Sequence, residues 1–342
     1  MKKAKYSHLS REERHVFYAY INENLSLRAI DSRMGRRASG LCREIKENSK
    51  DGTREGYDPD YAHLKSQFRK WDANRRKPLK SREVMEYVLE KLLEDQWSPD
   101  QISKTIKLDY PNNPAMRISY ETVYQFINSE EGKELGLVKH LRHGKPRKTK
   151  KKRLKPMDPK KQAIPNRISI HERPTIVERR GRYGDWESDL MEGNKNSKVV
   201  LSVQKELRSQ HVFLKKLKDK SSGETKRDIS RKLKPLPQSL RRTMTFDNGR
   251  ENAQHIKLVR HLGIKTYFCD PYSSWQKGSV ENVIGLIRQY IPKGTDLSTV
   301  SEKQIQEIQD KLNNRPRKCL GYKTPHQVLS KHLKSLGVQL RS

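Results

Sequence analysis

Residues 197–218, SKVVLSVQKELRSQHVFLKKLK, predict a β-hairpin, because two runs rich in Val, Leu and Phe flank a short polar turn. A strand-like segment, YGDWESDL at 183–190, precedes this hairpin. Helix-like and strand-like patterns then alternate: a helix at 224–236, a strand at 241–246, a helix at 252–263, a strand at 264–270 and a helix at 277–291. A hairpin followed by such alternation is typical of a mixed sheet with helices on its faces. We therefore expect an α/β domain with a mixed five-stranded sheet at 166–335.

The chain is strongly basic and poor in apolar residues. Its 342 residues contain 74 Lys and Arg against 41 Asp and Glu, which gives a formal net charge of +33. Such a charge favours a polyanionic partner, most commonly nucleic acid, although ribosome-associated and membrane-surface proteins are also basic. With 32% hydrophobic residues we expect small cores joined by solvated segments. No apolar run reaches the roughly 18 residues of a membrane-spanning helix. The first residues lack the apolar stretch of a secretory signal, and the three cysteines are widely separated, so we expect a reduced, cytoplasmic protein with no membrane partner.

Residues 1–50 have the pattern of a compact helical domain. Ser10 and Glu13 form a capping-box pattern, and Ser26 and Gly35 stand where a short helix would begin and end. A second helix follows, with Leu41, Cys42 and Ile45 expected to point inward. Two short helices joined by a glycine-containing turn predict a DNA-binding helix-turn-helix, although an ordinary helical hairpin with a solvated face has the same pattern. The outward residues, which we expect to contact DNA, are Arg36, Arg37, Ser39, Arg43 and Lys46.

Residues 57–138 repeat this organisation. Ser98 and Pro99 begin one helix, and after a loop rich in Pro and Asn, Ser119 begins another. This second helix carries its apolar residues on one side, at Val123, Phe126 and Ile127. We expect a second helix-turn-helix, with a dimerisation or packing helix as the alternative. Its expected DNA contacts are Ser119, Tyr120, Tyr124 and Gln125.

A basic linker is expected at 139–165. It contains the run KPRKTKKKR and almost nothing that could be buried, so it cannot form a core. We expect it to follow DNA phosphates as a flexible arm, while a solvated tether remains the alternative. The residues expected to contact DNA here are Lys148, Lys150, Lys151, Lys152 and Arg153.

Three acidic residues stand at positions where strand and helix ends would meet. Asp189 lies in the first strand-like segment, Asp247 begins the turn after TMTF, and Glu281 is near the start of a helix. Three converging carboxylates could hold two divalent cations about 3.5–4 Å apart, which is the arrangement used for phosphoryl transfer. Each residue also has an ordinary structural interpretation. Asp185 and Glu187 would lie on the same face of the strand as Asp189, and spacing alone does not choose among them.

Four long segments resemble the IS30 family of insertion-sequence transposases: GDWESDL at 184–190, TFDNG at 245–249, DPYSSWQKGSVENVIGLIRQYIPKGTDL at 270–297 and NNRPRKCLGYKTP at 313–325. The resemblance continues in YSHLSREER, WSPDQIS, ISYETVYQFI and IPNRISIHERP, and so covers nearly the whole chain. That family has an RNase H-like, retroviral-integrase-like catalytic domain with a DDE triad. By position, the resemblance implies that Asp189, Asp247 and Glu281 form the triad.

Residues around the implied triad are candidates for holding DNA. Trp275 and Lys277 could bind a DNA end by stacking and phosphate contact. Arg288, seven residues after Glu281, and Lys293 could contact the backbone, although a solvated basic helix face would look the same. Two positions depart from the family pattern, which usually has Gly at the place of Ser188 and often Asn at the place of Ile284.

The resemblance implies a DNA transposase that binds the terminal inverted repeats of its element and target DNA. It implies two Mg²⁺ per active site, with Mn²⁺ as a substitute, and cleavage followed by strand transfer. It also implies a homodimer or higher oligomer and a circular intermediate. The alternatives are a DNA-binding regulator with a non-catalytic nuclease-like domain, and a metal-dependent nuclease that cuts without joining.

Overall fold

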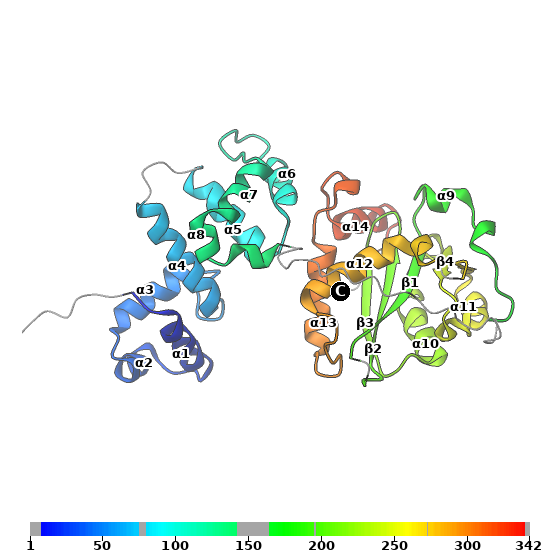
Figure 1. Cartoon of the computed structure of the whole chain (residues 1–342), viewed down its shortest axis with the longest axis horizontal. Helices are drawn as coiled ribbons and strands as arrows, with labels where there is room; N and C mark the ends of the chain where they lie inside the picture. The colour runs from blue at the N-terminus through cyan, green and yellow to red at the C-terminus, as the bar shows by residue number, and fades with distance from the viewer. Residues whose placement is uncertain (1–7, 75–79, 142–163, 195, 272, 339–342) are drawn as a thin grey trace, which may run out of the picture. The chain divides into compact units, whose positions relative to one another are not determined.

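The computed structural model describes residues 8–74, 80–141, 164–194, 196–271 and 273–338. The chain divides into two compact units, Met1–Lys145 and Pro146–Ser342 (Figure 1). The expected basic contacts at Lys148, Lys150, Lys151, Lys152 and Arg153 lie outside the described residues. No helix in the described part of the chain is long and apolar enough to cross a membrane.

The secondary structure in the described part of the first unit is helical. Its helices are α1 (Arg11–Asn22), α2 (Leu27–Met34), α3 (Ala38–Asn48), α4 (Pro59–Asn74), α5 (Arg82–Leu93), α6 (Pro99–Asp109), α7 (Tyr120–Asn128), α8 (Glu130–Glu134) and the 3₁₀ helix η1 (Leu137–His140). The expected helix starts are confirmed, since the Ser10 and Glu13 capping box forms at α1 and the Ser119 hydroxyl caps α7. Gly35 ends α2 in the left-handed conformation with φ of 63°, which glycine adopts without steric cost.

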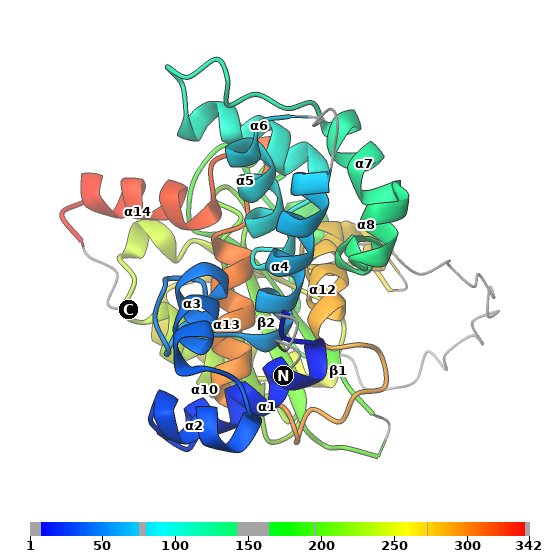
Figure 2. The ribbon, with the colours of Figure 1, turned by 90° about the vertical axis from the view of Figure 1, so that its left-hand side faces the viewer.

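The first unit contains two apolar cores that share a helix. One core is built from α1 to α3 and the start of α4, and the other from the end of α4 to η1. Ala62 of α4 packs into the first core and Phe68 into the second. In Figure 2, α4 runs between α1 to α3 and α5 to α6. The segments expected at 1–50 and 57–138 are therefore joined by a continuous packed helix.

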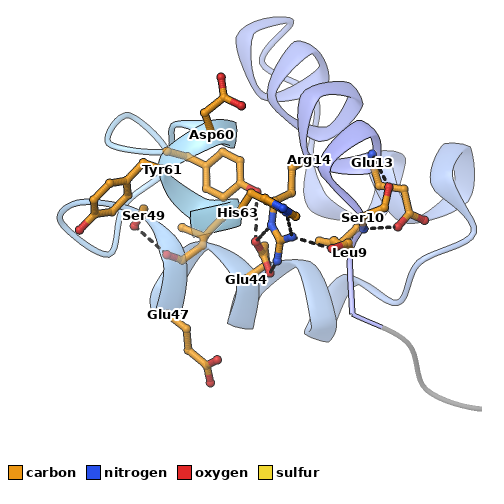
Figure 3. A network of polar contacts seen from close by, with 12 residues as sticks. Leu9, Ser10, Glu13, Arg14, Glu44, Glu47, Ser49, Asp60, Tyr61 and His63 are labelled. Carbon is orange, nitrogen blue, oxygen red and sulfur yellow. Dashed lines mark hydrogen bonds and ion pairs between the residues drawn. The ribbon is translucent and has the colours of Figure 1, made fainter. Parts of the chain in front are cut away.

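A buried ion pair fixes α3 against α1. Arg14 is 1% exposed, and its Nε donates to Oε1 of Glu44 across 2.7 Å. The same guanidinium donates to the backbone oxygen of Leu9 (Figure 3), and the Tyr57 hydroxyl donates to Glu44. A desolvated arginine needs such a full set of acceptors. This network explains why a charged residue stands on the inner side of α3.

The inward face of α3 differs from the expectation at one position. Leu41 and Ile45 are buried as expected, but Cys42 is exposed. Positions 41, 44, 45 and 48 form the buried stripe of this helix, so residue 42 falls off it. The polar Glu44 and Asn48 complete the stripe in place of a cysteine.

The second unit has a mixed five-stranded sheet, which confirms the sheet expected from the sequence. Its strands are β1 (Asp185–Glu192), β2 (Val200–Glu206), β3 (Val212–Leu217), β4 (Thr243–Phe246) and β5 (Lys265–Phe268). They lie in the order β3-β2-β1-β4-β5. The three first strands pair antiparallel, whereas β4 is parallel to β1 and β5 is parallel to β4. This topology fits an RNase H-like domain, with β1 in the centre.

Helices pack on both faces of the sheet. The main ones are α10 (Ser222–Leu233), α11 (His255–Leu262), α12 (Gly278–Tyr290), α13 (Glu302–Asn313) and α14 (Pro325–Ser335). Shorter elements are α9 (Thr175–Glu178), η2 (Ile170–Glu172), η3 (Gln238–Leu240), η4 (Arg250–Asn252), η5 (Ser274–Lys277) and η6 (Lys318–Leu320). One core joins α12 and α13 to Met191, Leu201 and Val203, and the other joins α10, α11 and α14 to Trp186 and Met244.

Replacing Glu44 with Ala is expected to destabilise the first core, because the Arg14 guanidinium would stay buried without its carboxylate. Removing one partner of a buried ion pair costs about 3–5 kcal/mol. Hydrogen–deuterium exchange of peptides from α1 and α3 would show this as faster amide exchange. The matched control is Glu86→Ala, which removes the exposed partner of Arg82 and should cost about 0–1 kcal/mol. Equal exchange in both variants would contradict a stabilising role of the buried pair.

Candidate functional site

The parallel pairing of β1 with β4 brings two of the three expected carboxylates together where β4 ends beside β1. Asp185 lies opposite Thr243 and Glu187 opposite Thr245, so each β1 residue faces the β4 residue 58 positions later. Asp189 and Asp247 have the same separation in sequence. Asp247 directly follows the last residue of β4. Continuing the register by two residues therefore sets these aspartates side by side.

A buried lysine lies between the two aspartates. Lys277 is 1% exposed, and its Nζ is 3.5 Å from Oδ1 of Asp189 and 3.2 Å from Oδ2 of Asp247. The same ammonium donates to the backbone oxygen of Ser188 across 3.2 Å. The two carboxylates thus converge on one cation. Lys277 was expected to contact DNA; in this structure its ammonium is enclosed by protein oxygens, and a contact with DNA stays a prediction.

The charges at this position shift the pKa values of Asp189 and Lys277. Burial raises the pKa of the Asp189 carboxyl; the Lys277 ammonium opposes the rise and Asp247 adds to it. Burial alone would lower the pKa of Lys277, but the two aspartates outweigh it and hold that pKa above its ordinary value. Two like charges this close favour a cation between them.

Local hydrogen bonds orient Asp247. Its Oδ1 accepts from the Gly249 N–H across 3.1 Å and from the Asn252 amide across 2.9 Å. The other oxygen, Oδ2, is the one that contacts Lys277. The Asp-Asn-Gly turn therefore does more than reverse the chain, because it fixes which oxygen of Asp247 meets the cation.

The structure separates the three acids of β1 that spacing left open. Asp185 accepts from the Thr243 hydroxyl across 2.7 Å and pairs with Arg182. Glu187 accepts from the backbone N–H of Val280 across 2.9 Å, in the first turn of α12. Both are buried and bound to protein groups, whereas the Asp189 side chain remains 20% exposed and meets Lys277. Only Asp189 is thus placed beside Asp247.

Glu281 follows Asp247 by 34 residues and is not joined to the Asp189–Asp247 pair. It is exposed on α12, four residues after Lys277. No hydrogen bond or ion pair connects it to Asp189 or Asp247 in the described part of the chain. Among the described residues, no three His, Cys, Asp or Glu side chains are grouped so that they could hold a metal ion. Of the three expected carboxylates, the structure therefore brings together Asp189 and Asp247 but not Glu281.

Glu251 is a further acid near the pair that the sequence analysis missed. Burial raises the pKa of its carboxyl; the Asp247 carboxylate adds to this rise, Lys277 opposes it and Asp189 adds to it. It lies in η4, directly after the Asp-Asn-Gly turn. Its position four residues after Asp247 was the available signal, but a single acid after a turn has no distinguishing pattern.

A cavity of about 420 Å³ lies beside the segment that leads into α12, and neither Asp189 nor Asp247 is among its lining residues. Arg173, Arg180 and the first residues of α12 line it, together with Glu187 and Trp275. Trp275 is 71% exposed, so its ring is accessible for stacking. Guanidinium groups beside an exposed aromatic ring suit a ligand that carries both phosphate and a flat base.

The expected DNA contacts of the first unit fall into two groups. Arg37, Ser39, Arg43 and Lys46 are exposed on or next to α3, and Tyr120, Tyr124 and Gln125 are exposed on α7. Arg36 is instead half-buried and forms an ion pair with Glu13 across 2.7 Å, and its contact with DNA stays a prediction. Glu13 is also the third residue of the capping box of α1, whose N-cap is Ser10. The Ser119 side chain is exposed, but its oxygen accepts from the Thr122 N–H as the cap of α7.

The basic residues of the second unit also differ from one another. Lys293 is exposed after α12. Arg288 is half-buried, and its guanidinium donates to the backbone oxygen of Glu192 across 2.6 Å. Burial lowers the pKa of Arg288. Its guanidinium therefore ties α12 to the end of β1, which the seven-residue spacing from Glu281 did not indicate.

Curated proteins of known type resemble the chain over nearly its whole length. It is 38% identical over 335 residues to a transposase for insertion sequence element IS1086 from Cupriavidus metallidurans, covering 97% of each chain. It is 34% identical to transposase InsI for insertion sequence element IS30A of Escherichia coli, covering 95% of this chain and 84% of that one. The chain belongs to the IS30 family of transposases. A transposase for element IS4351 from Bacteroides fragilis is 37% identical, covering 94% of each chain.

Other comparisons of this IS30-family chain are weaker. No protein-family model matches it. The catalytic core domain of BIV integrase aligns with a TM-score of 0.34 and 20% identity, covering 44% of this chain and 98% of that one. The HTLV-2 integrase catalytic core domain in complex with magnesium aligns with a TM-score of 0.32 and 18% identity, covering 43% and 96%.

Ser188 and Ile284, the two positions expected to depart from the family pattern, lie in different environments. Ser188 is buried, and its backbone oxygen accepts from Lys277. Ile284 is half-buried and packs against the apolar core between α12, α13 and the sheet. An apolar side chain suits that environment, so Ile284 contributes to holding α12 on the sheet.

Replacing Glu187 with Ala is expected to loosen the first turn of α12, because the buried Val280 N–H would lose its acceptor. Leaving a buried donor unpaired costs about 1–3 kcal/mol. The change is measurable as faster amide exchange across 278–284. Glu187→Gln keeps an acceptor oxygen and should retain most of the protection, and Glu192→Ala, at the exposed end of the same strand, should have no effect on this turn. If the Ala and Gln variants exchange alike, the hydrogen bond does not anchor α12.

Proposed function

We propose that this chain is a DNA transposase whose second unit cuts and joins DNA at the ends of an insertion sequence. In this proposal, Asp189, Asp247 and Glu281 are the catalytic carboxylates and the ligands of Mg²⁺, two ions per active site, with Mn²⁺ as a substitute. Family membership supports DNA transposition and a polynucleotidyl-transferase type of enzyme. The cleavage, joining and metal steps are inferred from the chemistry of the site.

The observation that carries the proposal is the cation shared by Asp189 and Asp247. Their oxygens already enclose a positive group, with Nζ of Lys277 3.5 and 3.2 Å away. Carboxylate oxygens are hard ligands of the kind that Mg²⁺ prefers. The donor set therefore fits a divalent cation, provided that the lysine leaves and that Glu281 turns toward the pair.

The chain's own residues would supply position and charge. Divalent ions bound here would lower the pKa of an attacking water or 3′-hydroxyl and stabilise charge on the phosphate during in-line displacement. Asp247 would present Oδ2 because its Oδ1 is held by the turn. Glu281, one helical turn after Lys277, is near enough in sequence to close the trio without unfolding α12. Trp275 and the arginines of the neighbouring cavity would hold the DNA end.

The first unit would recognise the terminal inverted repeats. We infer that α3 and α7 act as the reading helices of two helix-turn-helix motifs, with Arg37, Ser39, Arg43 and Lys46 on α3 and with Ser119, Tyr120, Tyr124 and Gln125 at α7. Base-edge contacts would give sequence preference and the basic arm at 139–165 would add affinity through phosphates. Lys293 would contact the backbone, and Arg288 would do so after leaving Glu192.

Assembly follows from the reaction. Two element ends must be held together, so we propose a homodimer or higher oligomer with target DNA as a further partner. A circular intermediate with abutted ends is part of the same proposal. A regulator with a non-catalytic second unit would bind the ends without cutting, and a nuclease would cut without joining.

Glu281→Gln is expected to abolish both cleavage and joining while DNA binding persists, because it removes a metal-binding charge without changing shape. Catalysis of this kind should fall by at least about 10³-fold. The measurement incubates the protein with DNA flanking its gene and Mg²⁺ or Mn²⁺, and sequences the cut ends and new junctions. The matched control is Glu302→Gln, which changes an exposed acid of α13 that pairs with Lys215 of β3. This variant should remain active. Undiminished cleavage by Glu281→Gln would contradict the assignment of this residue to the catalytic site. In the wild type, cutting without joining would indicate a nuclease, and DNA binding without either reaction would indicate a regulator.

Arg43→Ala is expected to weaken binding to element-end DNA more than binding to unrelated DNA. A lost base contact costs about 1–3 kcal/mol and relaxes specificity at one position. Fluorescence anisotropy at fixed salt with both DNAs measures the ratio. Arg33→Ala removes the same charge from α2, where Arg33 pairs with Glu23, and should leave this ratio unchanged. Equal losses on both DNAs for Arg43→Ala would mean that α3 contacts only the backbone.

A further inference from the structure

Lys277 is the most deeply buried cation beside the proposed metal ligands. Its side chain is 2% exposed, against 20% for Asp189 and 40% for Asp247. It is the last residue of η5 and the residue before the first position of α12. Its ammonium has three oxygen neighbours, one from each aspartate and one from the backbone of Ser188. It fills the position toward which both carboxylates point.

This position cannot hold an ammonium and a metal ion together. A Mg²⁺ ion binds oxygen ligands at about 2.0–2.1 Å, so an ion held by both aspartates would need the carboxylate oxygens that the ammonium contacts. An ammonium 3.2 Å from one of those carboxylates would then be in contact with a divalent charge. Two positive groups in such close contact repel each other, and the repulsion from a divalent ion is twice that from a single charge. One of the two must leave.

We propose that the Lys277 ammonium is an internal counter-ion that occupies the Asp189–Asp247 site before metal enters, and that metal binding requires its departure. This inference rests on the proposed function, because it takes the two aspartates as metal ligands. Lys277 acts in it as a competitor of the metal and as the counter-ion of the two carboxylates until metal binds. It offsets the repulsion between the like charges of Asp189 and Asp247.

The chain around Lys277 allows the ammonium to leave. The next residue is Gly278, where an added Cβ would meet nothing within 4 Å, so there is free space at the junction of η5 and α12. The four-carbon stem of lysine gives many alternative rotamers. The hydrogen bond from the Val280 N–H to Glu187 holds α12 three residues after Lys277, so the helix need not move. The released ammonium would then be free for a DNA phosphate, which is the role the sequence suggested for it.

Exchange of this kind couples metal and DNA. If Lys277 is available to phosphate only after the metal has displaced it, then metal raises DNA affinity, and by linkage DNA raises metal affinity. The protein without DNA would hold metal weakly, because its own lysine competes. Strong metal binding would be confined to the complex with DNA.

The first test measures metal affinity without DNA. Full-length protein is titrated with Mn²⁺, and free Mn²⁺ is followed by its electron paramagnetic resonance signal. Lys277→Met should bind Mn²⁺ about tenfold more tightly than the wild type, because a competing charge at contact distance is removed. Lys277→Arg keeps the charge and should bind as weakly as the wild type. The matched control is Lys232→Met, which removes another lysine bound to a carboxylate, Asp228, and should leave the affinity unchanged.

The second test needs no substitution. Lysines of the wild-type protein are labelled with an amine-reactive ester and quantified by mass spectrometry, with and without Mn²⁺. Lys277 should react slowly in the metal-free protein and faster when metal is bound. Lys205, which is 3% exposed and donates to the backbone oxygen of Ser279, is an internal reference that should not respond.

Unchanged or weaker Mn²⁺ binding by folded Lys277→Met would overturn the proposal, as would equal labelling of Lys277 with and without metal. The Asp247→Asn variant separates this failure from failure of the proposed function. If Asp247→Asn abolishes Mn²⁺ binding while Lys277→Met binds Mn²⁺ no more tightly than the wild type, the metal site stands and only the exchange is wrong. If neither Asp247→Asn nor Asp189→Asn affects Mn²⁺ binding, the metal site itself is wrong, and the exchange with it.

Discussion

The parallel pairing of the central strand β1 with β4 is the constraint on which the second unit depends. It places Asp189 of β1 beside Asp247 at the end of β4, because these residues continue the register of Glu187 opposite Thr245. Two carboxylates in that position repel unless a cation lies between them. In this structure the cation is the Lys277 ammonium. The sheet thus creates a site that requires positive charge, and the segment before α12 supplies it.

The position of α12 follows from a second set of charges on the same face of β1. Glu187 accepts from the Val280 N–H, where the positive end of the helix dipole favours a carboxylate. On the paired strand, Lys205 faces Glu187 and donates to the backbone oxygen of Ser279. Burial lowers the pKa of Lys205 to about 7. These contacts hold the first turn of α12, and thereby set where Lys277 and Glu281 stand relative to the sheet.

The sequence predicted what depends on local pattern and failed where long-range partners decide. Hairpin composition and helix alternation predicted the mixed sheet, and serine caps predicted the starts of α1, α6 and α7. The three acids of β1 alternate identically in sequence, and only their partners in space distinguish Asp189 from Asp185 and Glu187. In the same way, no spacing rule shows that Arg36 pairs with Glu13 or that Lys277 is buried. Charge is visible in a sequence, whereas its neutralisation is not.

This limit has a consequence for how a charge of +33 is interpreted. Several of the basic residues are buried and unavailable to a partner, since none of them is more than 3% exposed: Arg14, Lys205, Lys277 and Arg315. A cation engaged by a protein carboxylate releases no counterion from DNA, so it contributes nothing to the salt dependence of binding. If metal displaced Lys277, its ammonium would leave the protein's carboxylates and bind a DNA phosphate, and it would then contribute to the salt dependence of binding. The electrostatic footprint on DNA would then depend on whether the acidic site holds lysine or metal.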